Sequence, residues 1–241
     1  CPLSWHHPDM SLQPGQSSFP HIVSRVLESY GSIWAYSRQF VGGKLTYDPV
    51  YEWLMQDTRW IPQDGLLLDI GCGRGILLGV LEMACRSGVL HRSGLSLMGV
   101  EARTAEAKLA QRALGDSAQI VLGDIRSFEL PACAAVILLD VLLYLNPVEQ
   151  MELLDRIARS LEPGGVLLIR EANATSGWRF RMTAWAECLC AWSRFDFGQR
   201  YHYRSMGEWL TELESRGFRV RTESMSSGTP FANVLFLAHK T

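Results

Sequence analysis

The stretch that decides the fold is LLLDIGCGRG, residues 66–75. It begins with an apolar run as long as one buried strand, and it continues into a loop with glycine at positions 71, 73 and 75. Glycine is needed where a backbone adopts positive φ or approaches a ligand closely. A buried strand followed by a glycine loop and a helix to residue 86 is typical of the first unit of a parallel α/β sheet.

Strands and helices alternate after this stretch. Further strands are expected at 95–100, 119–122, 134–139, 166–169, 218–223 and 233–238, with helices at 104–114, after Asn146, at 178–192 and at 205–216. This alternation predicts an α/β fold with a mostly parallel sheet. Upstream, we expect a helix over 21–39 that is ended by Gly42-Gly43, and a second helix from Pro49. We therefore divide the chain into a tail and helical cap, 1–60, and one ligand-binding domain, 61–241.

Composition limits the class of protein. The 241 residues are 47% hydrophobic and 20% charged, which is typical of a soluble globular protein. The net charge of -2 argues against a general nucleic-acid binder, so no nucleic-acid partner is expected. No apolar run approaches the ~18 residues of a membrane span, so no transmembrane segment is expected. The six cysteines match no zinc spacing, which favours reduced thiols in a cytoplasmic protein without a metal site.

The spacing of the glycine loop indicates what it binds. Its pattern is G-x-G-x-G, whereas dinucleotide sites have G-x-G-x-x-G. Asp69 lies two residues before the first glycine, where its carboxylate would repel a pyrophosphate. The same carboxylate suits a cofactor with positive charge and no phosphate, and S-adenosylmethionine is such a molecule.

Acidic residues follow the next three strands as well. Glu101 ends the second strand, where an acidic side chain can accept hydrogen bonds from both ribose hydroxyls. Asp124 follows the third strand and could accept from an adenine amino group, with Ile125 against a ring face. Asp140 follows the fourth. Each carboxylate alone could be a helix cap or a solvated loop residue, but four in register at one sheet edge favour a ligand site.

These residues resemble the class I, Rossmann-like, S-adenosylmethionine-dependent methyltransferases. The resemblance implies a seven-stranded sheet with its last strand antiparallel, helices on both faces and, for this chain, an N-terminal helical extension and a lid insertion after the fifth strand. It implies that S-adenosylmethionine is the cofactor. The matching motifs are LLLDIGCGRG (66–75), MGVEA (98–102), VLGDI (121–125), VILLDVLLYL (136–145) and LEPGGVLLI (161–169). The residues implied to bind the cofactor are Asp69, Gly71, Cys72, Gly73, Glu101, Ala102, Asp124, Ile125, Asp140 and Val141.

Three residues are candidates for removing a proton from the acceptor, which is needed only if the acceptor carries one. His202 is the first candidate because its ordinary pKa is near neutrality, although a packing or structural role is the simpler explanation. Tyr144 follows the fourth strand, where an acceptor contact is expected. Glu171 ends the fifth strand and is either a base or a loop carboxylate.

The segment 178–204 is rich in aromatic residues and arginines. Aromatic rings favour a large flat or apolar acceptor, and arginines favour a carboxylate or phosphate on it. A small-molecule acceptor presented by a carrier protein or by CoA would satisfy both demands. A packed helix with a solvated arginine face is the plainer explanation. The residues expected to contact the acceptor are Tyr144, Trp178, Arg181, His202 and Tyr203.

The sequence therefore predicts S-adenosylmethionine-dependent methyl transfer to a hydrophobic small molecule, with or without an anionic group, of aryl, acyl or polyketide-like type. Two alternatives stay open. One is a non-catalytic module that binds the cofactor, and the other is a lipid methyltransferase at a membrane surface.

Overall fold

The computed structural model describes residues 19–31, 35–178, 180, 182, 200–226 and 228–241. They form one seven-stranded sheet in the order β3-β2-β1-β4-β5-β7-β6. β7 pairs antiparallel with both β5 and β6, and the other neighbouring strands pair in parallel. The strands are β1 (Asp64–Ile70), β2 (Gly94–Glu101), β3 (Gln119–Leu122), β4 (Cys133–Leu139), β5 (Leu161–Ala172), β6 (Phe218–Ser224) and β7 (Asn233–Lys240).

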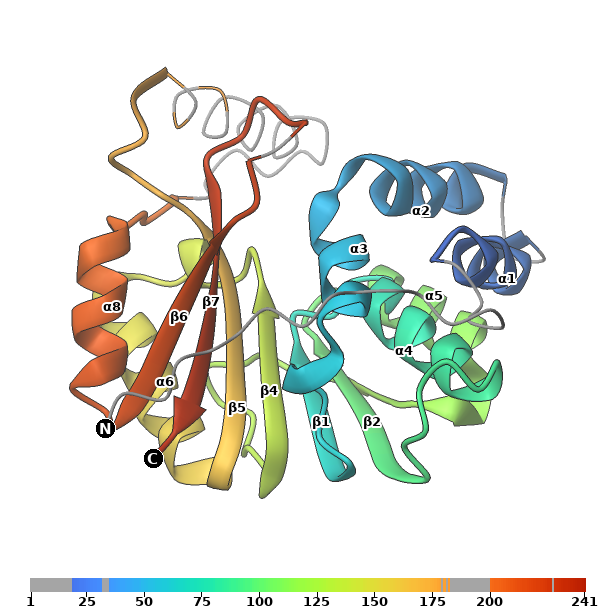
Figure 1. Ribbon diagram of the computed structural model, residues 1–241, viewed down its shortest axis with the longest axis horizontal. Helices are drawn as coiled ribbons and strands as arrows, with labels where there is room; N and C mark the ends of the chain where they lie inside the picture. The colour runs from blue at the N-terminus through green and yellow to red at the C-terminus, as the bar shows by residue number, and fades with distance from the viewer. Residues whose placement is uncertain (1–18, 32–34, 179, 181, 183–199, 227) are drawn as a thin grey trace, which may run out of the picture.

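Helices cover both faces of the sheet (Figure 1). The helices are α1 (Phe19–Gly31), α2 (Ala35–Tyr47), α3 (Pro49–Gln56), α4 (Ile76–Arg86), α5 (Thr104–Leu114), α6 (Pro147–Ser160) and α8 (Met206–Glu214). Short 3-10 turns lie at Thr58–Trp60, Gly115–Ser117 and Leu142–Tyr144. The expected Rossmann-like architecture with its antiparallel last strand is confirmed.

Alternate residues of β1, β2, β4, β5 and β7 belong to two different hydrophobic cores. Leu67 of β1 packs with apolar residues of α1, α3 and α4, whereas Leu68 and Ile70 pack with α6 and α8. This is the period-two alternation of a strand that is buried on both faces. The helical extension shares the first core, since Ile22 and Val26 of α1 belong to it. The division into two domains at residue 60 stays a prediction.

Two details of the N-terminal prediction were wrong. Gly42-Gly43 does not end a helix, because α2 runs through both glycines to Tyr47. A methyl group on Gly42 would meet only Leu27, and one on Gly43 would meet nothing, so no special backbone conformation required glycine there. The predicted single helix over 21–39 is instead α1, which ends at Gly31, and α2, which begins at Ala35; residues between them are not described.

The carboxyl ends of the parallel strands meet at one edge of the sheet. β7 points to the bottom of Figure 1, so the parallel strands end at the top, and α2 lies there. Most of the insertion expected after β5, including Arg181, lies outside the described residues. Among the described residues, no helix has the length and apolar character needed to cross a membrane.

Candidate active site

The glycine loop after β1 is held tightly to β2. The amides of Gly71 and Cys72 both donate to the carbonyl of Val100, at 2.8 and 3.2 Å. Gly71 has a φ of +70°, and a Cβ there would lie 2.6 Å from a methyl carbon of Val141. Gly73 also has positive φ, at +55°, but a Cβ there would meet nothing within 4 Å. The loop therefore leaves open space beside Gly73, which is where a ligand can approach the backbone.

Glu101 connects the end of β2 to this loop. Its side chain is buried, and one carboxylate oxygen accepts from the Gly73 amide at 2.9 Å. The other oxygen accepts from the amide and the guanidinium of Arg103, at 2.9 and 3.1 Å. Ala102, which lies between Glu101 and Arg103 in the sequence, is exposed. The carboxylate is thereby fixed at the rim of the glycine loop.

Asp69 is a buried carboxylate beside Glu101. Burial, reinforced by the nearby Glu101 charge, raises the pKa of Asp69 to about 8. Burial and the same two carboxylates raise the pKa of the Cys72 thiol, so this cysteine stays a neutral thiol. A site with two close, buried acids favours a cationic ligand, which would lower the cost of ionising Asp69.

Asp140 lies after β4 in a strained backbone conformation, with φ of 58°. Its carboxylate pairs with the guanidinium of Arg170 on β5, and Nε of Arg170 donates to it at 2.9 Å. The other guanidinium edge of Arg170 contacts Asp48, the N-cap of α3, at 2.6 Å. Arg170 is only 2% exposed. One buried arginine thus connects the helical cap to the loop after β4.

The helical cap also reaches the cofactor edge of the sheet. The hydroxyl of Tyr30 on α1 donates to the carbonyl of Arg74 in the glycine loop, at 2.6 Å. The guanidinium of Arg74 lies 4.3 Å from the centre of the Phe40 ring on α2. Tyr51 of α3 is buried close to Asp69 and Asp140, and burial together with the charge on Asp48 raises its hydroxyl pKa.

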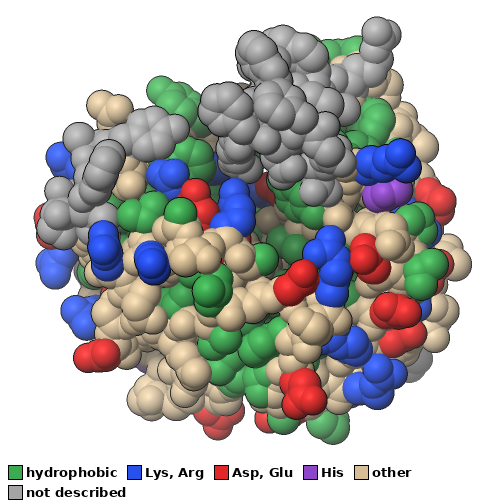
Figure 2. All heavy atoms as spheres, turned by 180° about the vertical axis from the view of Figure 1, so that it is seen from behind, with side chains coloured by type: hydrophobic (Ala, Val, Ile, Leu, Met, Phe, Trp, Pro, Cys, Tyr) green, Lys and Arg blue, Asp and Glu red, His purple; other side chains and the backbone are tan. Residues whose placement is uncertain are grey.

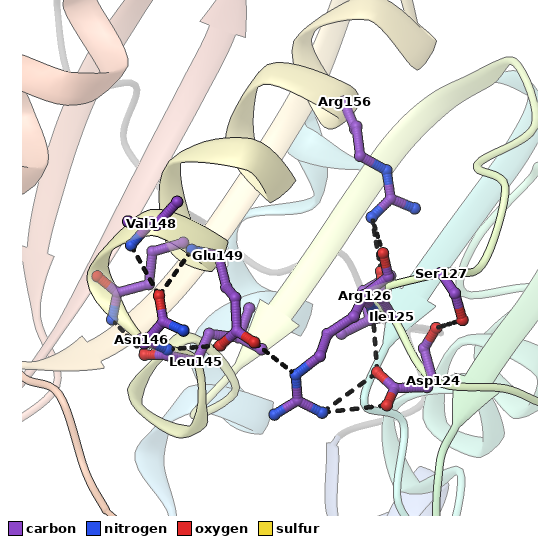
Figure 3. A network of polar contacts seen from close by, with 10 residues as sticks. Asp124, Ile125, Arg126, Ser127, Leu145, Asn146, Val148, Glu149 and Arg156 are labelled. Carbon is purple, nitrogen blue, oxygen red and sulfur yellow. Dashed lines mark hydrogen bonds and ion pairs between the residues drawn. The ribbon is translucent and has the colours of Figure 1, made fainter.

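Asp124 and Ile125 belong to a second polar network, drawn in Figure 3. Asp124 is about half exposed and pairs with Arg126, which also contacts Glu149 at 3.0 Å. Glu149 and Asn146 form the capping box of α6. Ile125 is buried, and its carbonyl accepts from Arg156 of α6 at 2.7 Å. This network attaches the loop after β3 to the start of α6.

Glu171 is 2% exposed and faces the backbone of the loop after β4. It accepts from the Leu142 amide at 2.7 Å and from the Val141 amide. Burial and the charge on Asp140 outweigh these bonds and raise its pKa to about 8. Glu171 therefore holds the loop that carries Tyr144.

The acceptor-side residues form a chain of aromatic rings. The Tyr144 ring lies 5.6 Å from the Tyr201 ring, and the Tyr203 ring lies 6.2 Å from Tyr201 and 4.9 Å from Phe180. Tyr144 also helps to raise the pKa of the Arg103 guanidinium, which is bound to Glu101. Trp178 is exposed.

His202 is bound into the same region through its backbone. Its amide donates to the Leu143 carbonyl at 2.9 Å, and its side chain is half-buried. The structure thus brings Tyr144, His202 and Tyr203 into one region. Arg181 lies outside the described residues.

The surface carries both signs of charge. In the view of Figure 2, Lys and Arg side chains are interspersed with Asp and Glu side chains over the visible described surface. Among the described residues, no group of three or more His, Cys, Asp or Glu side chains is arranged to hold a metal ion.

Several residues of this region were not predicted from the sequence: Arg170, Asp48, Tyr51, Tyr30 and Gln150. Arg170 had a signal, because it is a charged residue at the end of the apolar run 166–169. Gln150 had one too, since it lies on the helical stripe of Leu154, Ile157 and Leu161, where an apolar residue is expected. The three residues of the helical cap had none, because their partners are far away in sequence.

Comparison with known proteins agrees with this geometry. A family model described as "Methyltransferase domain" matches residues 52–223. The carboxy-S-adenosyl-L-methionine synthase of Citrobacter koseri is 28% identical over 158 residues, 64% of this chain and 56% of that protein. The synthase of Desulfotalea psychrophila is 33% identical over 118 residues, 47% of this chain and 46% of that protein. The chain thus spans about half the length of these curated relatives.

Solved structures share the fold at low identity. An O-methyltransferase family protein from Burkholderia thailandensis has a TM-score of 0.62 and 16% identity, over 86% of this chain and 60% of that one. Human N-acetylserotonin methyltransferase in complex with S-adenosylmethionine has a TM-score of 0.58 and 18% identity, over 95% and 60%. Magnesium protoporphyrin IX methyltransferase from Synechocystis has a TM-score of 0.57 and 19% identity, over 92% and 97%. The family model covers well over half of the chain, and the fold and the acidic sheet edge agree with it: the chain belongs to the class I, S-adenosylmethionine-dependent methyltransferases.

Proposed function

We propose that this chain transfers the methyl group of S-adenosylmethionine to a hydrophobic small-molecule acceptor. The observation that carries the proposal is the pair of buried carboxylates, Asp69 and Glu101, at a glycine loop. A phosphate-bearing cofactor would be repelled by Glu101 and would further oppose ionisation of Asp69. A ligand with a sulfonium and an ammonium group would be attracted by Glu101 and would favour the ionised form of Asp69.

The residues at the glycine loop fit such a cofactor. The open space beside Gly73 accommodates its amino-acid part, and Asp69 supplies the negative charge that faces its cation. Glu101 would accept hydrogen bonds from the ribose hydroxyls. We assign the adenine to the loop of Asp124 and Ile125. Asp140 and Val141 would line the floor beside the sulfur.

The acceptor would lie against the ring chain of Tyr144 and Tyr203, with Trp178 at its edge. When bound, S-adenosylmethionine supplies a methyl group whose bond to sulfur breaks as its bond to the acceptor forms. The chain mainly has to hold the acceptor in line, because orientation alone can contribute ~7–11 kcal/mol. His202 would take the acceptor's proton where there is one. Glu171, bound to two backbone amides, would position the loop.

The finer identity of the acceptor is also a proposal. Aromatic rings on the acceptor side favour an aryl or acyl group. Presentation by CoA or by a carrier protein rests on arginines that include Arg181, outside the described residues.

A second candidate is synthesis of a carboxylated S-adenosylmethionine, favoured by the names of the relatives at 28–33% identity. A carboxylate beside the sulfur would need a positive partner. Arg170, the buried guanidinium nearest Asp140, is already shared by two aspartates. Within the described part of the chain, this charge balance favours methyl transfer.

One assay separates the two. The chain is incubated with S-adenosylmethionine and a panel of hydroxyaryl and aminoaryl carboxylic acids, and the products are analysed by mass spectrometry. Methyl transfer predicts S-adenosylhomocysteine together with an acceptor that is heavier by one methylene. A cofactor that is heavier by the mass of CO2, with one panel acid lighter by the same mass and no methylated panel compound, would support the second candidate and contradict the first.

A further inference from the structure

Gln150, in the second turn of α6, makes an unusual number of contacts for one buried amide. The residue is 0% exposed. Its side-chain nitrogen lies 2.9 Å from the carbonyl oxygen of Leu142, 3.3 Å from that of Leu145 and 3.0 Å from that of His202. Its side-chain oxygen accepts from Nε of Arg204 at 2.7 Å. Both donor hydrogens and the acceptor of the amide are therefore used.

These contacts join two segments that are distant in sequence. Residues 141–145 follow β4 and carry Tyr144. Residues 200–204 precede α8 and carry Tyr201, His202 and Tyr203. Gln150 and His202 are 52 positions apart. Apart from Gln150, the two segments are connected by the backbone bond from His202 to Leu143 and by the ring contact between Tyr144 and Tyr201.

The two segments carry the side chains that we expect to contact the acceptor, so their relative position affects how the acceptor is held. Tyr144 interacts electrostatically with Arg103, whose guanidinium is bound to Glu101 at the cofactor edge. The 200–204 segment carries the remaining rings and His202. A shift of one segment against the other would therefore move the acceptor-side rings relative to the methyl donor. A misplacement of 1 Å can cost ~100-fold in rate.

We propose that Gln150 is a positioning residue that fixes residues 141–145 against residues 200–204, and so sets the acceptor geometry without contacting the acceptor. The inference rests on the proposed function for its catalytic consequence, but the joining of the segments does not depend on it. Leu at this position would fill the same volume and leave the carbonyls of Leu142 and His202 without that donor. Buried carbonyls that lose a partner favour opening of the segments toward water.

The test compares Gln150→Leu with Leu154→Val. Leu154 is buried one turn further along α6, in the core that also holds Leu142 and Leu145, and its side chain forms no hydrogen bond, so this control weakens core packing without removing the amide contacts of Gln150. Hydrogen exchange is followed by mass spectrometry. In Gln150→Leu, peptides over 141–145 and over 200–204 should both exchange at least tenfold faster, while peptides over 66–75 keep the wild-type rate. In Leu154→Val, both segments should keep it.

A spectroscopic readout separates positioning from general stability. With labelled tyrosines, the cross-peak between the Tyr144 and Tyr201 rings should be lost in Gln150→Leu and retained in Leu154→Val. Where the assay above finds a methyl acceptor, Gln150→Leu should raise the KM for that acceptor and lower kcat, with the Kd of S-adenosylmethionine within twofold of wild type. Unchanged exchange in either segment, or a retained ring contact, would overturn the inference. Failure to methylate any panel compound would count against the proposed function. The inference about Gln150 would then be tested by the hydrogen-exchange result alone.

Discussion

At the residue scale, the site contains several buried carboxylates and one buried arginine, and the charges of these groups determine what the site can bind. Asp48 and Asp140 share Arg170, and Glu101 pairs with the half-exposed Arg103, whereas Asp69 has no ion-pair partner among the described residues. Burial raises the pKa of Asp48, but Arg170 and Lys44 outweigh it and hold that pKa below its ordinary value. Asp69, without such a partner, is shifted the other way. The two aspartates therefore have different roles: Asp48 stabilises the helical cap, and Asp69 is left to bind a cationic ligand.

Loss of the Asp48 charge should loosen the helical cap. Asp48→Asn keeps a side-chain acceptor for the Val50 amide but removes the ion pair with buried Arg170. We expect a loss of about 1.5–3 kcal/mol in the free energy of unfolding, the typical value of a hydrogen bond to a charged group.

The matched control is Asp57→Asn. Asp57 also caps a helical turn and binds arginines, but Arg59 and Arg221 are largely exposed. Exposed pairs contribute up to about 1 kcal/mol. Urea denaturation of both variants measures the difference, and equal losses would contradict the assignment of Asp48.

The raised pKa values of Asp69 and Glu171 predict a pH dependence of stability. Both carboxyls hold a proton in the folded chain up to about pH 8, whereas the unfolded chain releases them near pH 4. Between these values the folded state binds more protons, so the free energy of unfolding must fall as pH rises, by at most ~1.4 kcal/mol per pH unit for each group. The charged or titratable groups facing Asp69 are Glu101, Cys72 and Tyr51.

Urea midpoints of the ligand-free chain at pH 7 and pH 8.5 measure this dependence. The midpoint should be lower at pH 8.5, and Asp69→Asn should reduce the difference. A midpoint that rises with pH, or a difference that is unchanged in Asp69→Asn, would show that Asp69 is ionised in the folded chain.

At the element scale, the start of α6 supports three parts of the site. Its capping residue Glu149 pairs with Arg126 of the loop after β3 (Figure 3), and Gln150 contacts the segments on the acceptor side. The capping box at Asn146 was predicted from the sequence alone, because cap residues and Pro147 act locally. The contacts of Glu149 and Gln150 were not, since they join elements that only the tertiary fold brings together.

Removal of the α6 cap should therefore have more than a local effect. Asn146→Ala removes the acceptor of the Val148 and Glu149 amides and should cost about 1 kcal/mol. It should also speed hydrogen exchange in the loop of Asp124. The exposed Arg159→Ala on the same helix is the control and should change neither. An intact Asp124 loop in Asn146→Ala would show that the loop does not depend on the cap.

At the scale of the whole molecule, the strand order places four acidic strand ends along one edge of the sheet. Periodicity and punctuation were enough to predict each strand of the sheet, because buried strands and glycine loops are local features. The edge itself was predicted from the motif after β1. The sequence alone did not show how the helical cap contacts that edge, because Arg170, Tyr51 and Tyr30 interact with residues that are distant in the sequence. The continuation of α2 through Gly42-Gly43 was missed because tertiary packing outweighed the helix-breaking tendency of glycine.

Calorimetric titration at pH 7 tests the central claim, that the acidic edge receives a cofactor with a positive charge and no phosphate. S-adenosylmethionine and NAD are each titrated into the wild type, into Glu101→Gln and into Glu152→Gln, which changes an exposed glutamate on α6. The account predicts that S-adenosylmethionine binds the wild type and the Glu152 variant equally, binds Glu101→Gln at least about tenfold more weakly, and that NAD gives no binding heat. Tighter binding of NAD than of S-adenosylmethionine, or an unchanged affinity in Glu101→Gln, would contradict it.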